Sequence, residues 1–171
     1  NVLQKSNGTL NELVGKFCND LGISNTENLN NFFIGKFSDN NINNTISNDK
    51  ITLIRDLKEN GYKVILFSNS CCLLNNDAIK EIYDLVDGVF YSYDIGYTKD
   101  DKESYQYVEK TLNVKPTEIL HIGDTLKSDY LKPVENGWNA LFYGVSDDES
   151  VNCISSLMEL YDFFDIRTSK K

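Results

Sequence analysis

Residues 51–69 read ITLIRDLKENGYKVILFSN, and this stretch decides the fold class. Ile51, Ile54 and Leu57 recur at helical spacing, and the pair Asn60-Gly61 ends the periodic segment. The mainly apolar run Tyr62–Phe67 follows at once and predicts a buried strand. A helix that leads directly into a buried strand is half of a βαβ unit.

The same alternation of helices and strands continues to the end of the chain. It predicts further strands at Gly88–Tyr91, Ile119–Ile122 and Trp138–Tyr143, and helices near Asp77–Leu85, Glu103–Leu112, Ser128–Glu135 and Val151–Phe164. Apolar strands that alternate with helices are typical of a parallel sheet with helices on both faces. We therefore expect a three-layer α/β fold whose functional residues lie in the loops after the strands.

The first part of the chain reads as helical. Thr9-Leu10-Asn11-Glu12 is a capping-box pattern, and apolar residues repeat at helical spacing from Leu10 to Leu21, before Gly22. A second, poorer helical stretch covers residues 27–34. The Asn-rich residues 38–48 predict a loop or linker.

Composition excludes several classes of function. The chain has 171 residues, enough for one compact unit, and a net charge of −9, which disfavours nucleic acid and anionic membranes as partners. It has no long apolar run and no signal-peptide pattern, so we expect a cytoplasmic protein. The four cysteines and the single histidine show no zinc-ligand spacing.

Polar residues follow two of the expected strands. Ser68 and Asn69 come directly after the first strand, where a hydroxyl and the following N–H groups can hold a phosphate oxygen, although Ser and Asn also often begin ordinary turns. Lys99 follows the second strand by a few residues and could neutralise a phosphate or a carboxylate. The alternative for Lys99 is a solvated surface charge.

The third strand ends in the strongest local signal, Gly123-Asp124, with a second carboxylate at Asp129. Mg²⁺ prefers oxygen ligands, and two carboxylates at a strand end can hold it directly or through supporting contacts. The alternative is a turn residue followed by a helix cap.

Taken together, residues from about 51 to 164 resemble the haloacid dehalogenase-like (HAD) hydrolase superfamily. Val64–Asn69 is similar to its second motif, a hydrophobic strand that ends in Ser or Thr and then Asn, and Gly96–Lys99 is similar to its third, which carries a lysine. Gly123–Asp129 is similar to its fourth, an acidic magnesium motif. The resemblance implies a HAD-like, Rossmann-type sheet with a small helical cap.

The resemblance also implies roles for these residues. Ser68 and Asn69 would bind phosphate, Lys99 would bind phosphate and act in catalysis, and Asp124 and Asp129 would serve a Mg²⁺ site. The implied substrate is a small phosphorylated metabolite, hydrolysed through an aspartyl-phosphate formed on a nucleophilic Asp.

The sequence departs from the family pattern at two points. Asp100 stands where a proline usually follows the motif lysine, and the first motif, a strand followed by Asp-x-Asp-Gly-Thr, is absent. Lys5–Leu10 keeps Gly-Thr-Leu but has Lys5 and Asn7 at the two carboxylate positions, and we interpret this likeness as accidental because the capping box explains Thr9.

We therefore divide the chain into a helical cap-like segment, residues 1–48, and a HAD-like core, residues 49–171. We expect the first motif upstream of Asn1, where there is also room for a further domain. The sequence leaves two functions open. The first is a magnesium-dependent phosphatase whose nucleophile lies outside this chain, so that the chain alone is inactive. The second is a noncatalytic HAD-derived binding or regulatory domain of a larger protein. A receiver-like or flavodoxin-like protein is disfavoured because no acidic or phosphate-binding loop follows an early strand.

Overall fold

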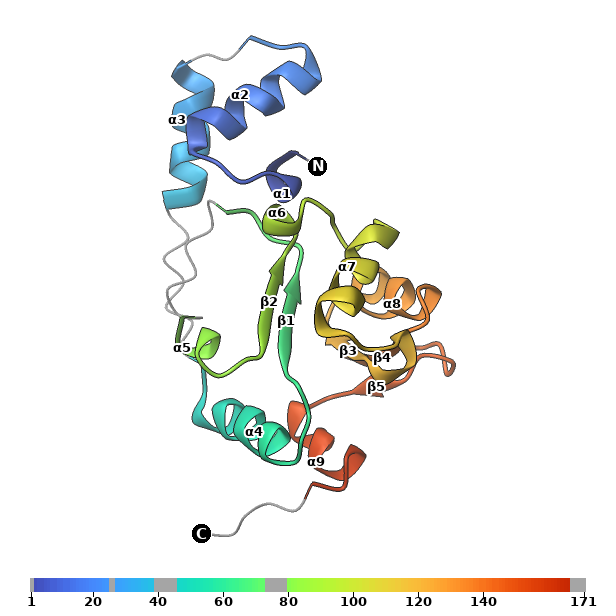
Figure 1. Cartoon of the computed structure of the whole chain (residues 1–171). Helices are drawn as coiled ribbons and strands as arrows, with labels where there is room; N and C mark the ends of the chain where they lie inside the picture. Colours follow the sequence, from blue (N-terminus) through green and yellow to red (C-terminus); the bar gives the residue numbers. More distant parts are fainter. Residues whose placement is uncertain (1, 25–26, 39–45, 73–79, 167–171) are drawn as a thin grey trace.

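A computed structural model describes residues 2–24, 27–38, 46–72 and 80–166 (Figure 1). Three helices gather at one end of the molecule: α1 (Val2–Lys5), α2 (Leu10–Leu21) and α3 (Glu27–Ser38). Helix α2 packs on α3 and buries Leu13, Val14 and Cys18. This helical end corresponds to the expected cap-like segment, although its boundary at residue 48 stays a prediction.

The capping box at the start of α2 is confirmed. The Thr9 hydroxyl accepts a hydrogen bond from the Glu12 N–H, and the Glu12 carboxylate accepts one from the Thr9 N–H at 2.8 Å. Gly22 ends the helix in the left-handed conformation that glycine adopts at little cost. Helix α3 runs on to Ser38, beyond the expected residues 27–34, and most of the expected linker lies outside the described residues.

The rest of the described chain alternates helices and strands. The strands are β1 (Ile65–Ser68), β2 (Gly88–Tyr91), β3 (Leu120–Gly123), β4 (Asn139–Tyr143) and β5 (Cys153–Ile154). The helices are α4 (Asn48–Glu59), α5 (Lys80–Tyr83), α6 (Ser92–Ile95), α7 (Lys102–Leu112), α8 (Lys132–Glu135) and α9 (Leu160–Phe163). Part of the helix expected at 77–85 falls on residues that the structure does not describe.

The strands form two parallel sheets instead of one continuous sheet. β1 pairs with β2, with Ile65 opposite Gly88, and β3 pairs with β4, with Leu120 opposite Asn139. β5 adds to the outer side of β4, and Figure 1 shows the two sheets side by side. The α/β class and the parallel direction are confirmed, whereas the sheet is divided between β1 and β3.

Two hydrophobic clusters cover both sheets. In the first, Leu53 and Leu57 of α4 pack with Leu141 of β4 and Ile154 of β5. In the second, Phe67 and Phe90 pack with Tyr105 and Val108 of α7 and with Trp138, which precedes β4. The first cluster also contacts Val64, which precedes β1, and the second also contacts Ile119, which precedes β3, so each sheet packs against residues that flank the other.

The expected closing helix at 151–164 is wrong in its first part. Cys153 and Ile154 form β5, because Phe142 N–H donates to Asn152 O and Gly144 N–H donates to Ile154 O, which satisfies the outer edge of β4. Helical structure begins only after Ser156, with a short 3₁₀ turn at Leu157–Glu159 that leads into α9.

No helix in the described ranges is long and apolar enough to span a membrane. The cytoplasmic location stays a prediction.

Candidate active site

The residues that the sequence singled out lie at the carboxyl ends of β1, β2 and β3. Ser68 is the last residue of β1, and Gly123 is the last residue of β3. Lys99 lies in the loop between α6, which follows β2 directly, and α7. The carboxyl ends of parallel strands share one edge of a sheet, and this edge is the usual place for a binding site.

The Asn69 side chain fixes the loop that carries Lys99. Its Oδ1 accepts a hydrogen bond from the Lys99 N–H at 2.8 Å. On the other side of the loop, the Tyr105 hydroxyl donates to the Lys99 carbonyl at 3.0 Å. Thr98 donates from its N–H and its hydroxyl to the Asp101 carboxylate, at 2.7 and 2.8 Å. The backbone of Lys99 is therefore held from β1, from α7 and from within its own loop.

The Lys99 side chain is buried and charged at this edge. Only 7% of its surface is exposed, and its Nζ lies 2.6 Å from Asp129 Oδ1. The ammonium also lies 5.3 Å from the centre of the Phe67 ring. The alternative interpretation of Lys99 as a solvated surface charge is wrong, because a buried ammonium needs a partner and Asp129 supplies it.

Asp129 collects hydrogen bonds from several directions. Its Oδ2 accepts from the Thr125 N–H at 3.0 Å, and its Oδ1 accepts from the Ser128 hydroxyl at 3.3 Å as well as from Lys99. Burial alone raises the pKa of this carboxyl, but the hydrogen bonds from His121 and Lys99 outweigh burial and the net pKa is lowered. Asp129 is thus a buried anion that holds Lys99 in place.

A π-helix brings Asp129 back over the end of β3. Residues Leu126–Leu131 form this wide turn, and the Lys132 N–H donates to Lys127 O, five residues earlier. A Cβ atom added to Gly123 would lie 2.6 Å from the Asp129 Cγ and Oδ2 atoms. Only glycine fits at this position, so the Gly123-Asp124 pair of the sequence reflects a close approach of backbone and carboxylate.

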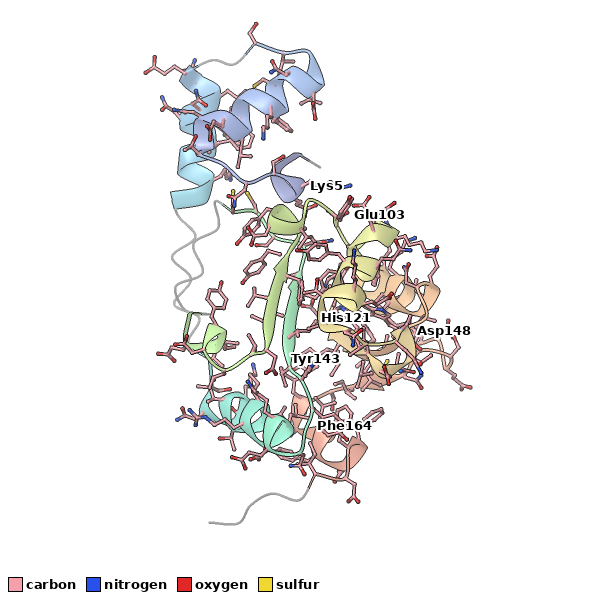
Figure 2. The ribbon with its side chains drawn as sticks, in the orientation of Figure 1. Lys5, Glu103, His121, Tyr143, Asp148 and Phe164 are labelled. Carbon is pink, nitrogen blue, oxygen red and sulfur yellow. The ribbon has the colours of Figure 1, made fainter. Side chains whose placement is uncertain are left out.

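His121 belongs to this cluster, and sequence reasoning missed it. Its Nε2 lies 3.3 Å from both Lys99 Nζ and Asp129 Oδ1 (Figure 2 labels His121 in the interior). Burial lowers the pKa of His121, and the nearby Lys99 charge lowers it further, so the neutral imidazole is favoured. The available signal was the alternation of the strand, which places residues 121 and 123 on one face of β3.

Two polar groups at the same edge have no partner among the described residues. Ser68 and Asp124 make no side-chain hydrogen bond or ion pair there, and Asp124 is exposed. The carboxylate of Asp124 is a suitable oxygen ligand for Mg²⁺. The part of the chain that the structure describes contains no group of three or more His, Cys, Asp or Glu residues that could hold a metal ion, so Asp124 would need further oxygens from elsewhere.

The likeness of Lys5–Leu10 to the missing first motif does not extend to the structure. Lys5 ends the short helix α1, which lies against α6, and it is not part of a strand. Its ammonium pairs with Asp101 at 2.6 Å, and Figure 2 labels Lys5 beside α1, between the α2 and α3 helices and the strands. The interpretation of this segment as the approach to a helix cap agrees with these contacts.

Comparisons by family model and by structure both find haloacid dehalogenase-like proteins. A family model described as haloacid dehalogenase-like hydrolase matches residues 19–131. Among solved structures, a HAD phosphatase from Thermococcus onnurineus is 18% identical, with a TM-score of 0.63, and the match covers 92% of this chain and 89% of that one. No curated protein matches the chain by sequence.

Two further structures share the fold. A HAD-like family hydrolase from Porphyromonas gingivalis is 15% identical over 96% of this chain and 78% of its own, with a TM-score of 0.63. A HAD family enzyme from Bacteroides thetaiotaomicron, solved with magnesium and inorganic phosphate, is 19% identical over 86% of this chain and 75% of its own, with a TM-score of 0.58. The family model covers most of the chain, and we conclude that this protein belongs to the haloacid dehalogenase-like hydrolase family.

Proposed function

We propose that this chain is the major part of a magnesium-dependent phosphatase that acts on a small phosphorylated metabolite. The observation that carries the proposal is the buried Lys99–Asp129 pair at the carboxyl edge of the strands. The Ser68 hydroxyl and the Asp124 carboxylate lie at the same edge and have no partner in the described part of the chain. These groups occur in the order of the family motifs. The magnesium and phosphate bound to the Bacteroides enzyme lend support by analogy.

Each residue has a distinct role in this proposal. The Ser68 hydroxyl and the Asn69 amide donate hydrogen bonds to phosphoryl oxygens, and Lys99 balances negative charge on the phosphate. Asp124 would ligate Mg²⁺, and Asp129 supports the site by holding Lys99 and the Thr125 N–H in position. Bound Mg²⁺ would neutralise phosphoryl charge.

In this proposal no residue of the chain is assigned as the attacking carboxylate, because neither Lys5 nor Asn7 can act as a nucleophilic or acid–base Asp. The site would therefore form an aspartyl-phosphate only when a nucleophilic Asp carboxylate is supplied to it. The alternative function, a noncatalytic HAD-derived binding or regulatory domain, takes the missing Asp-x-Asp motif as a genuine loss.

Binding of inorganic phosphate in the presence of Mg²⁺, measured by calorimetry, tests the site. A hydrogen bond to a charged group contributes about 1.5–3 kcal/mol, so Ser68→Ala should weaken phosphate binding about tenfold or more. Asp124→Asn should remove the dependence of binding on Mg²⁺. Ser155→Ala, at an exposed serine whose partner is Glu159, is the matched control and should change nothing.

An assay of phosphate-ester hydrolysis distinguishes the phosphatase from the noncatalytic domain. The chain alone should not hydrolyse p-nitrophenyl phosphate, and it should do so when an Asp-x-Asp segment is supplied. Hydrolysis by the chain alone that is lost in Asp124→Ala would exclude the noncatalytic alternative and also the external nucleophile. Absence of any phosphate binding with Mg²⁺ would overturn the proposed site.

A further inference from the structure

His121 lies between the two charged members of the candidate site. Its Nε2 atom lies 3.3 Å from Lys99 Nζ and 3.3 Å from Asp129 Oδ1. A protonated imidazole would place a second positive charge beside the Lys99 ammonium, so the neutral ring, which carries one N–H, is favoured. Nε2 can therefore donate to Asp129 in one tautomer or accept from Lys99 in the other, but no single tautomer does both.

The two tautomers differ in how well they satisfy Asp129. Each oxygen of a carboxylate has two lone pairs. Asp129 Oδ1 already accepts from Lys99 at 2.6 Å and from the Ser128 hydroxyl at 3.3 Å, and Oδ2 accepts from the Thr125 N–H at 3.0 Å. The Nε2–H of His121 would be a third donor on Oδ1, so it competes with Lys99 and Ser128 for two lone pairs.

The tautomers also differ in how well they satisfy Lys99. Its ammonium has three N–H donors, and the Phe67 ring, whose centre is 5.3 Å from Nζ, contacts the charge without replacing a hydrogen-bond acceptor. When Nε2 is an acceptor, Asp129 and His121 engage two of the three N–H groups and one is left for a ligand. Two anchors fix the rotation of the ammonium about its Cε–Nζ bond, whereas Asp129 alone does not.

The packing around His121 holds the ring but does not require a ring nitrogen. The side chain is only 8% exposed, and the rings of Phe67 and Trp138 lie 5.8 and 6.2 Å from its centre. These contacts also fit an alternative in which His121 is simply a member of the aromatic core. An aromatic core needs the shape of the ring, and a hydrogen bond to Lys99 needs Nε2, so the two roles can be tested separately.

We propose that, in the phosphate-bound site, the Nε2 atom of His121 accepts a hydrogen bond from Lys99 and so positions the ammonium. Lys99 then donates to Asp129, to His121 and to a phosphoryl oxygen, and all three N–H groups have acceptors. Asp129 Oδ1 keeps Lys99 and Ser128 as its two donors. His121 is thus a positioning residue that acts on the phosphate through Lys99. The inference rests on the proposed function, because phosphate is the third acceptor.

Nitrogen NMR of the isotope-labelled full chain tests this assignment directly. His121 is the only histidine, so the spectrum contains a single pair of ring nitrogens. It is recorded at neutral pH with Mg²⁺ and with inorganic phosphate at a concentration that calorimetry shows to saturate the site. The proton should lie on Nδ1, and Nε2 should have the shift of an unprotonated nitrogen. A proton on Nε2 would overturn the proposal.

Two substitutions separate the ring from its nitrogen. His121→Phe keeps the ring and removes the acceptor, whereas His121→Gln supplies an amide oxygen near the position of Nε2. Phosphate binding should weaken about five- to tenfold in His121→Phe, as expected for one lost hydrogen bond, and stay within about twofold of the parent in His121→Gln. Rotation of the Lys99 ammonium, measured by nitrogen relaxation, should become about two- to tenfold faster only in His121→Phe.

Tyr130→Phe is the control for a general loss of stability. Tyr130 adjoins Asp129 in the π-helix, and its hydroxyl donates to Ser150 O and accepts from the Asn152 N–H. Its removal should lower the urea midpoint and leave phosphate affinity and the Lys99 ammonium unchanged. Equal phosphate affinity in His121→Phe and the parent, or an equal loss in the Phe and Gln variants, would overturn the proposal. If His121→Phe does not fold, the position of the ring proton in the parent protein decides.

Calorimetry distinguishes failure of this inference from failure of the proposed function. If the parent binds phosphate with Mg²⁺ and Nε2 carries the proton, the positioning role of His121 fails and the phosphate site stands. If the parent binds no phosphate, the proposed site is overturned, and the role of His121 in the phosphate-bound site is overturned with it.

Discussion

The Lys99 ammonium and the Asp129 carboxylate lie 2.6 Å apart, and each side chain is only 8% exposed. Removing one member leaves the other as an uncompensated buried charge, which costs about 3–5 kcal/mol. Asp129→Asn and Lys99→Met should therefore each lower the free energy of unfolding by this amount. The double variant should recover part of the loss, and urea denaturation of the four proteins measures the coupling.

A surface pair gives the matched control. Lys127 and Asp100 lie 3.0 Å apart, with side chains 68% and 49% exposed. Exposed pairs contribute about 1 kcal/mol or less, so a cycle of Lys127→Met and Asp100→Asn should show little coupling. Similar coupling in the two cycles would contradict the view that Asp129 is the essential partner of a buried lysine.

The stability of the protein should fall in two steps as the pH is lowered. Burial and the charge of Lys99 lower the pKa of His121, so the unfolded chain takes up its proton first and stability begins to fall below about pH 6.5. The net pKa of Asp129 is also lowered, by hydrogen bonds that outweigh its burial, so its contribution is complete above about pH 3.9 and is lost below it.

The first step can be assigned to one residue, because His121 is the only histidine in the chain. His121→Gln should flatten the dependence of the urea midpoint on pH between about 6.5 and 5 and leave the step below pH 4. An unchanged slope in the upper range would show that His121 does not titrate with a lowered pKa.

The sequence was sufficient to predict the local parts of this fold. The capping box at Thr9, the strand Gly88–Tyr91 and the end of α4 before Asn60-Gly61 all depend on neighbouring residues, and all three are confirmed. β5 could not be predicted in this way, because its two residues are extended only through pairing with β4. Periodicity over such a short segment carries no information about a distant partner.

The sequence predicted which residues form the site better than it predicted the contacts between them. Residues after successive strands were expected to meet, and Asn69, Lys99 and Asp129 do form one network. The assignment of Asp129 and Asp124 to a metal site stays a prediction. The inclusion of His121 depends on the π-helix, which brings Asp129 back to β3, and helical periodicity alone predicts an ordinary α-helix there.

The role of Thr9 can be tested separately from the chemistry. Loss of an N-cap hydroxyl costs about 1 kcal/mol, so Thr9→Ala should lower the free energy of unfolding by this amount and speed amide exchange in the first turn of α2. Thr9→Ser keeps the hydroxyl and should behave like the parent protein. Weaker phosphate binding in Thr9→Ala with unchanged exchange in α2 would instead place Thr9 in the binding site.

Replacement of Gly123 should disturb the site through the backbone. A Cβ atom at this position would lie 2.6 Å from Asp129, so Gly123→Ala should push the carboxylate away from Lys99 and the Thr125 N–H, at a cost of about 1–3 kcal/mol in unfolding free energy. Gly15 lies in α2 with no atom within 4 Å of an added Cβ, and Gly15→Ala should be neutral or stabilise by up to about 1 kcal/mol. Equal effects of the two substitutions on the urea midpoint would mean that the close approach at Gly123 is not required.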